Sequence, residues 1–319
     1  MYQSGKQALR FARQSGMVVL VLLAGAMSWA QQQQRPPAVP LVTHDPYFSV
    51  WSMADKLTDE NTKHWTGAQQ PIAGLVRIDG VVYRFMGATP RDVPAMQQIS
   101  LTVKATSTNY VFESAGVRLS VSFFTPAFPQ DLAILSRPVT YLSWDATTLD
   151  GKSHQVAVCL DIDPRIAVNS ADQPVVWGRS RAAGLKVLNV GSQDQRPLNR
   201  SGDDLRIDWG YFHLAVPEKE EATLVAAPRA LQVFAKSGTL PDADDMEMPR
   251  SAHGGAAHLA VLVPGNVAAG QTVSRHVLLS YTEGYAIEYL NRKLKPYWQR
   301  DGQSTEDMLA VAEQQYESL

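Results

Sequence analysis

Short stretches in which hydrophobic and polar residues alternate dominate the chain between residues 39 and about 283. The clearest is 117–123, where every second residue is apolar, as in a strand with one buried face. Turn-forming residues separate such stretches at the intervals of a β-sandwich. The other stretches are 99–105, 110–113, 140–145, 155–162, 185–190, 211–216, 258–263 and 272–281. No sustained 3.6-residue apolar stripe occurs here, so the pattern predicts a mainly β protein, a large antiparallel β-sandwich.

One hairpin can be predicted from its turn. Asp79-Gly80 separates the apolar stretches 74–78 and 81–86. Both residue types tolerate positive φ, which a two-residue hairpin turn requires. The sequence therefore predicts that these two stretches pair as antiparallel strands.

The pattern becomes helical after residue 283. The stretch 286–294 predicts a helix that ends before Lys295-Pro296, because the residue before a proline disfavours the α conformation. Ser304 and Asp307 have the spacing of a capping box. The apolar stripe that follows consists of Met308, Ala312, Tyr316 and Leu319.

An amphipathic helix must bury its apolar face, and two partners are possible here. The helix either folds back on the sandwich or begins a further helical domain. The stripe still runs at Leu319 without a Gly or Asn cap, which favours the second alternative. On that hypothesis the face is exposed, and deleting 304–319 should improve solubility.

The first thirty residues have the pattern of a cleavable signal peptide. Lys6, Arg10 and Arg13 precede the apolar stretch 17–26, and Ser28-Trp29-Ala30 offers small residues at the cleavage positions. The apolar stretch is short for a membrane span, so an uncleaved anchor is the less favoured alternative. We expect a secreted or periplasmic protein cleaved near Ala30, without a stable membrane span. Residues 31–38 follow as a Gln- and Pro-containing spacer.

Composition narrows the choice of function. With 29 basic and 31 acidic residues the formal net charge is −2, so nothing favours a nucleic acid as partner. The single cysteine, Cys159, excludes an internal disulfide, and its position in an apolar stretch predicts a buried core residue. The sequence lacks G-x-G-x-x-G, G-x-x-x-x-G-K-[ST], H-E-x-x-H and G-x-S-x-G. We therefore expect neither a cofactor nor a metal.

Three weaker polar groupings have plain structural interpretations. His253 and His258 flank a small-residue loop, but their spacing matches no strong metal motif. The acidic stretch 242–247 lacks the spacing of an EF-hand loop, and a solvated loop is favoured over a calcium site. Asp161 and Asp163 share one face at a strand end, where a turn cap is favoured over a cation site.

The segment 44–67 concentrates polar and aromatic residues. Aromatic faces beside carboxylates suit a polar, hydrogen-bonding ligand such as a sugar or an amino acid. The alternative is an N-terminal strand whose aromatic residues close one end of the sandwich. The candidate ligand-binding residues are Asp45, Trp51, Asp55, His64 and Trp65. No catalytic residue can be assigned.

Four separated motifs resemble the glutaminase A family of exported bacterial and fungal proteins. They are PLVTHDPYFSVWSMADKLTDENTKHWTG (40–67), GLVRIDGVVYRFMG (74–87), LRIDWGYFHLAVP (205–217) and LNRKLKPYWQRDG (290–302). The resemblance extends from about Pro36 to Leu319. It implies an N-terminal β-sandwich followed by a helical (α/α)6 domain that houses the catalytic site. The implied activity is cofactor-free hydrolysis of L-glutamine to L-glutamate and ammonia.

This sequence ends at the point where the helical domain of the family would begin, so we expect a truncated product that lacks the (α/α)6 domain. We therefore expect the non-catalytic β-sandwich of an exported glutaminase-family hydrolase. Its expected partners are the helical domain, in cis or in trans, and a small amide or sugar substrate in the intact enzyme. The alternatives are a stand-alone carbohydrate-binding sandwich and a fragment of a six-hairpin glycoside hydrolase. The expected organisation is a signal peptide (1–30), a spacer (31–38), a sandwich (39–283, with sub-regions 39–95 and 96–283) and a helical start (284–319).

Overall fold

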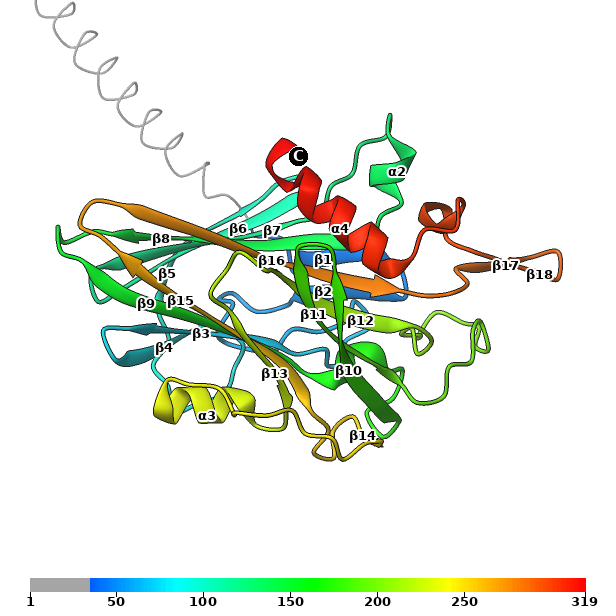
Figure 1. Ribbon diagram of the computed structural model, residues 1–319, viewed down its shortest axis with the longest axis horizontal. Helices are drawn as coiled ribbons and strands as arrows, with labels where there is room; N and C mark the ends of the chain where they lie inside the picture. Colours follow the sequence, from blue (N-terminus) through cyan, green and yellow to red (C-terminus); the bar gives the residue numbers. More distant parts are fainter. Residues whose placement is uncertain (1–34) are drawn as a thin grey trace, which may run out of the picture. The chain divides into compact units, whose positions relative to one another are not determined.

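Two antiparallel β-sheets face each other across an apolar core, which confirms the predicted fold class (Figure 1). One sheet has nine strands in the order β14-β10-β11-β12-β16-β8-β7-β6-β5, and the other has five in the order β13-β15-β9-β3-β4. Two smaller sheets are the hairpins β1–β2 and β17–β18. The strands alternate buried and less buried positions, as the sequence pattern requires.

The structure is a computed structural model that describes residues 35–319. The predicted signal peptide and the first four residues of the spacer, 31–34, lie outside these residues. Residues 37–319 form one compact unit. The strands are β1 Val39–Asp45, β2 Phe48–Ser52, β3 Ile72–Ile78, β4 Val81–Met86, β5 Gln97–Val103, β6 Ser107–Ser114, β7 Val117–Phe124, β8 Val139–Thr148, β9 His154–Ile162, β10 Pro174–Ala182, β11 Leu185–Ser192, β12 Tyr211–Pro217, β13 Thr223–Ala227, β14 Arg250–Ser251, β15 His258–Val267, β16 Thr272–Thr282, β17 Ile287–Tyr289 and β18 Arg292–Leu294.

Alternation along the central strands divides their side chains between the two faces of each sheet. In β9, Val158 and Leu160 enter the core between the sheets, whereas Cys159 points to the opposite face. Cys159 is completely buried there, which confirms the interpretation of this residue as part of the core. Strand β3 pairs with β9, so segments on either side of residue 96 share one sheet.

The Asp79-Gly80 hairpin forms as predicted. Strands β3 and β4 pair, and the two turn residues have φ values of 48° and 92°. These values are the positive dihedrals that a two-residue hairpin turn demands. The Asp79 carboxylate also accepts a hydrogen bond from the Gln155 N–H, which ties the turn to β9.

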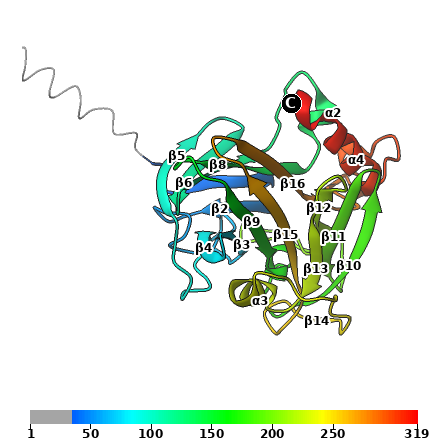
Figure 2. The ribbon, with the colours of Figure 1, turned by 60° about the vertical axis from the view of Figure 1, so that its left-hand side comes forward.

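One helix covers the outer face of each large sheet (Figure 2). Helix α3 (Ala230–Ser237) lies on the five-stranded sheet, and helix α4 (Thr305–Gln315) lies on the nine-stranded sheet. Ser304 and Asp307 form the predicted capping box. The remaining helical turns are α2 (Leu132–Leu135), η1 (Pro164–Ala167), η2 (Tyr297–Gln299) and η3 (Tyr316–Ser318).

The preference for an unpartnered C-terminal helix was wrong. Met308 and Leu309 are 1% exposed, and Ala312 is fully buried. Their partners are outward-facing residues of the nine-stranded sheet, including Tyr141, Leu185 and Leu278. The stripe therefore has its partner within the described residues, because the outer face of the sheet is itself apolar.

The predicted helix over 286–294 was also wrong. This segment is the hairpin β17–β18, which projects from the sheets in Figure 1 and whose six paired residues are all exposed. Its turn residues, Leu290 and Asn291, have φ values of 48° and 59°. Asn tolerates the left-handed region, but Leu rarely adopts it, so the sequence gives little sign of this turn.

Among residues 35–319, no helix is both long enough and apolar enough to cross a lipid bilayer.

Candidate functional site

The turn between β1 and β2 brings together most of the sequence-predicted ligand-binding residues. The Asp45 carboxylate accepts hydrogen bonds from the backbone N–H groups of Tyr47 (2.7 Å) and Phe48 (3.0 Å). This is the local capping geometry that Asp favours in turns. Burial raises the pKa of Asp45, and these two donors oppose the rise by favouring the charged form.

The side chains of His64 and Trp65 both form hydrogen bonds to the same backbone carbonyl. The Trp65 indole N–H donates to the Pro46 oxygen (2.6 Å), and His64 Nε2 lies 3.2 Å from that oxygen. Since a carbonyl only accepts, Nε2 carries the proton, and His64 Nδ1 accepts from the Thr66 hydroxyl at 3.0 Å. Burial lowers the pKa of His64 to about 4, so the ring is neutral. His64 thus positions the turn.

Trp65 differs from His64 in exposure. The Trp65 side chain is 47% exposed, whereas His64 is completely buried. The two rings lie 5.6 Å apart. The Trp65 indole is therefore fixed at its nitrogen and presents much of its ring to solvent, which is the arrangement that stacks on a flat or sugar-like ligand.

Glu283 is a further acidic residue, close enough to Asp45 to feel its charge, that the sequence analysis missed. It directly follows β16 and is half-buried. Burial, together with the negative charge of Asp45, raises the pKa of Glu283 to about 8. At neutral pH the pair therefore combines a protonated Glu283 with the carboxyl group of Asp45, a combination that can both donate and accept hydrogen bonds.

Trp209 links two aromatic residues, Tyr47 and Tyr285, that are close in sequence to Asp45 and Glu283. The Tyr47 and Trp209 rings lie 6.5 Å apart, and the Trp209 indole N–H donates to the Tyr285 carbonyl at 2.9 Å. Tyr47 and Tyr285 are more than a third exposed, while Trp209 is buried. We call Asp45, Tyr47, Trp65, Trp209 and Glu283 the aromatic–acid end. No local pattern identifies it, since its residues come from three distant segments.

The two other predicted residues, Trp51 and Asp55, make hydrogen bonds to other partners. The Trp51 indole N–H donates to the Ser49 hydroxyl at 2.9 Å, and its backbone pairs with Lys63. Asp55 is exposed, and its carbonyl accepts from the Gln98 side chain of β5. Neither contact joins the Asp45–Glu283 pair.

The weaker polar groupings of the sequence form ion pairs. His258 Nδ1 lies 2.6 Å from Asp161 Oδ1, and Arg165 binds Asp163 through two nitrogens. Burial opposes the charge on His258, but the two aspartates outweigh it and raise the pKa to about 9. In the acidic stretch, Asp244 pairs with Arg179. Within residues 35–319, no three His, Cys, Asp or Glu side chains are placed to hold a metal ion.

Comparison with known proteins gives one curated relative of notable similarity. Glutaminase A from Aspergillus oryzae (strain ATCC 42149 / RIB 40) is 29% identical over 237 residues, which cover 71% of this chain and 34% of the relative. The chain thus spans about a third of the length of that protein. The match supports a distant relationship with glutaminase A, as the sequence motifs indicated.

Solved structures show only low overall similarity. Heparan sulfate lyase HepC from Pedobacter heparinus has a TM-score of 0.38 at 8% identity, covering 88% of this chain and 43% of its own. A galactose mutarotase-like protein from Lactobacillus casei ATCC 334 has a TM-score of 0.35 at 8% identity, with coverages of 76% and 99%. Scores this low add nothing to the description of the fold.

Two family profiles divide the chain between them. The domain of unknown function DUF4964 matches residues 24–98, and the domain of unknown function DUF5127 matches residues 106–319. The second match covers most of the chain and contains β6 to β18 with both outer helices. The chain belongs to the DUF5127 family.

Proposed function

We propose that this chain is the N-terminal β-sandwich region of a larger exported hydrolase related to glutaminase A, and that the sandwich does not itself hydrolyse the amide. The observation that carries the proposal is the match to glutaminase A, which is confined to about a third of that protein. A further domain, joined in cis or supplied in trans, would then carry the catalytic groups.

In this proposal, the aromatic–acid end of the sandwich helps to bind the substrate. Amide hydrolysis requires an attacking nucleophile, a proton donor for the leaving amine and donors for the oxyanion. Asp45 and Glu283 supply carboxyl groups, and Trp65 supplies an exposed ring. These groups suit the binding of a polar substrate at the edge of a catalytic site. Trp51 and Asp55 are not part of the aromatic–acid end, and their role in ligand binding stays a prediction.

Activity measurements test whether the sandwich is catalytic. We expect the purified chain, 35.0 kDa with its leader, to release no ammonia from L-glutamine above the buffer background. Blotting extracytoplasmic fractions of the source cells should then detect a heavier product, and that product should hydrolyse glutamine. Release of ammonia by the purified chain would contradict the proposal, as would a native product of about 35.0 kDa without a partner.

A carbohydrate-binding sandwich is the second candidate, favoured by the exposed rings of Tyr47 and Trp65 beside carboxyl groups. Fluorescence titration with neutral oligosaccharides separates it from the first. Saccharide binding that Trp65→Ala weakens about tenfold, and Trp51→Phe leaves unchanged, would favour this candidate. A response to L-glutamine alone would favour the amide substrate.

A further inference from the structure

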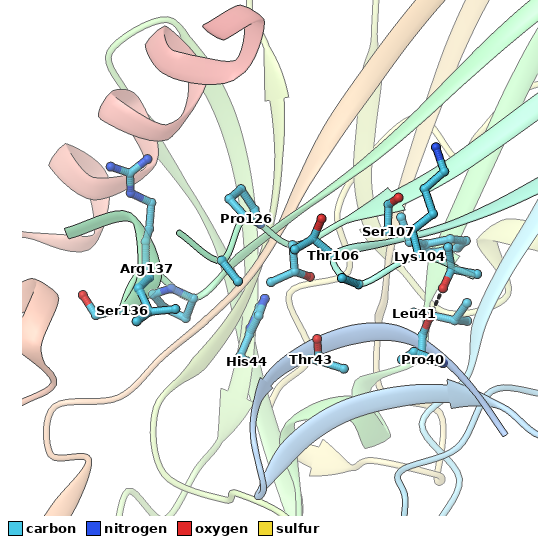
Figure 3. Close-up of a pocket in the computed structure, with 17 residues that line it drawn as sticks. Pro40, Leu41, Thr43, His44, Lys104, Thr106, Ser107, Pro126, Ser136 and Arg137 are labelled. Carbon is cyan, nitrogen blue, oxygen red and sulfur yellow. Dashed lines mark hydrogen bonds between the residues drawn. The ribbon is translucent and has the colours of Figure 1, made fainter. Parts of the chain in front are cut away.

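A cavity of about 260 Å³ lies beside β1, but its lining does not indicate a ligand (Figure 3). The Thr108 hydroxyl donates to the Pro40 carbonyl at 2.6 Å, so these two polar groups are already paired. The head groups of Lys104 and Arg137 are directed away from the cavity in Figure 3. The feature that does indicate a partner lies on the surface, at the hairpin β17–β18.

The projecting hairpin β17–β18 turns one mainly apolar face to solvent. Residues directly opposite each other in an antiparallel pair share a face of the sheet. Ile287 is opposite Leu294, and Tyr289 is opposite Arg292, and we call these four residues the hairpin face. Ile287 and Tyr289 are 55% and 63% exposed, and Leu290 in the adjoining turn is 79% exposed.

The opposite face of the hairpin is polar and is tied to the body of the protein. Glu288 and Lys293 are its cross-strand pair. The Lys293 ammonium donates to the Pro197 carbonyl at 3.0 Å, in the segment between β11 and β12. The polar face is thus held, whereas the hairpin face has no cover among residues 35–319.

A hairpin of this kind needs a partner to be a stable element. A two-stranded hairpin alone is marginally stable in water, because its apolar side chains need a further strand or a packed surface. Helices α3 and α4 bury their apolar sides on the sheets, but β17–β18 does not. Exposed apolar side chains gathered on one element mark an interaction site.

The position of the hairpin face favours another domain of the same hydrolase as its partner. The hairpin follows Glu283 of the aromatic–acid end, and the Tyr285 carbonyl between them accepts the Trp209 indole N–H. A partner seated on the hairpin face would therefore border the proposed substrate-binding end. The chain spans 34% of the length of glutaminase A from Aspergillus oryzae, so a larger hydrolase of this kind has further chain to supply that partner.

Two other occupants fit the hairpin face less well. A lipid bilayer would take up the tip of a hairpin, whereas the apolar residues here extend from the turn to the Ile287–Leu294 pair at its base. Two copies paired face to face would gather two Arg292 guanidinium groups on one small surface, where like charges repel. Arg292 has no ion-pair partner among residues 35–319, so a carboxylate on the partner would complete it.

We propose that the hairpin face is the docking surface for the catalytic domain of the larger hydrolase, and that the contacting surface of that domain is apolar with a carboxylate opposite Arg292. This inference rests on the proposed function. It adds the surface through which the two domains join, and it puts their boundary beside the aromatic–acid end.

Hydroxyl-radical labelling of the native product tests this docking surface. The reference is the purified 319-residue chain, and the native product is the longer chain or complex isolated from extracytoplasmic fractions. In the native product the labelling of Tyr289 and Leu290 should fall about fivefold, because a docked domain removes most of their accessible surface. Met246, 72% exposed on a separate segment, is the internal control and should be labelled equally in both.

Variants separate docking from folding. Ile287→Ser combined with Tyr289→Ser should leave the melting temperature of the purified chain unchanged, because both side chains are already in water. Introduced into the native product, this double variant should restore the labelling of Leu290 to the level of the purified chain. Arg292→Glu should do the same by placing a negative charge against the partner's carboxylate. Glu288→Gln, on the polar face, is the matched control and should change neither result.

Three results would overturn the proposal. They are equal labelling of Tyr289 in the native product and the purified chain, a dimer of the purified chain that the double variant dissociates, and binding to phosphatidylglycerol vesicles that the double variant abolishes. Equal labelling in a heavier native product would leave the proposed function standing. A native product of about 35.0 kDa without a partner would overturn both.

Discussion

The two outer helices cover equivalent faces of the two sheets, but different interactions hold them. Helix α3 buries Ala230, Leu231 and Phe234 against an apolar surface, and the Phe234 carbonyl accepts the Gly238 N–H at its end. Helix α4 buries an apolar stripe too, and it adds polar contacts to the sheet. The difference shows that an amphipathic pattern alone does not reveal how a helix is held.

The polar contacts of α4 lie at both of its ends: the Thr305 hydroxyl donates to the Thr282 hydroxyl of β16 at 3.2 Å, and the others gather at the last turn. Glu313 lies 2.8 Å from His276 Nε2 and 3.7 Å from the Lys219 nitrogen. The His276 ring stacks on Tyr316 at 3.8 Å, and the Tyr141 hydroxyl donates to the Ala312 carbonyl at 2.8 Å. The attachment of α4 therefore combines apolar burial with side-chain hydrogen bonds, whereas that of α3 depends on packing.

Replacing Phe234 by Ala should have the largest effect. Phe234 is completely buried between α3 and the five-stranded sheet, so we expect a loss of about 4 kcal/mol in the free energy of unfolding. Urea denaturation measures it. Val233→Ala, at a 36% exposed position of the same helix, should cost less than about 1 kcal/mol. Equal effects of the two substitutions would show that α3 does not depend on packing.

Replacing Leu309 by Ala should destabilise the chain by about 3 kcal/mol, because the side chain is 1% exposed against the nine-stranded sheet. The exposed Leu149 is the matched control, and Leu149→Ala should change little. Deletion of 304–319 should likewise lower both stability and solubility by uncovering the sheet. Improved solubility on deletion would instead support the interpretation that the sequence pattern favoured.

The His258–Asp161 pair predicts a pH dependence for the five-stranded sheet. The folded pKa of His258, about 9, lies above its ordinary value of 6.5. The stabilisation is therefore complete below pH 6.5 and is lost as pH rises toward 9, by about 3 kcal/mol. The carboxylates of Asp150 and Asp79 also raise the pKa of His154, but that contribution is common to wild type and to a His258→Gln variant.

The comparison of wild type with His258→Gln isolates this contribution. Unfolding free energies measured from pH 6 to pH 10 should fall less steeply in the variant. Parallel pH profiles for the two proteins would show that the pair does not stabilise the fold.

Glu313→Gln should have the smallest effect, about 1 kcal/mol, because the apolar stripe of α4 stays in place and the glutamine amide oxygen can still accept a hydrogen bond from His276 Nε2. Hydrogen exchange should detect faster opening of α4 with α3 unchanged. The exposed Glu317 offers the control Glu317→Gln. A loss as large as that in Leu309→Ala would mean that polar contacts, and not burial, hold α4.

The candidate site was predictable only in part. The segment 44–67 identified Asp45 and Trp65, because turn-capping acids and aromatic residues gather in one short stretch. Glu283 could not be identified in this way, since its significance depends on the distant charge of Asp45. His44 stood in the same segment, yet only the folded structure shows that its Nδ1 is buried and has no hydrogen-bond partner among residues 35–319.

The sequence by itself determined the elements whose cause is local. Two-residue alternation specified the strands, Asp79-Gly80 specified a turn, and Ser304 with Asp307 specified the start of α4. The tertiary structure decided what those elements contact. The segment with a helical pattern forms the hairpin β17–β18, with its turn at Leu290 and Asn291. The apolar stripe of α4 packs on the chain's own nine-stranded sheet. The physical reason is that burial and charge depend on neighbours distant in sequence, which local periodicity does not encode.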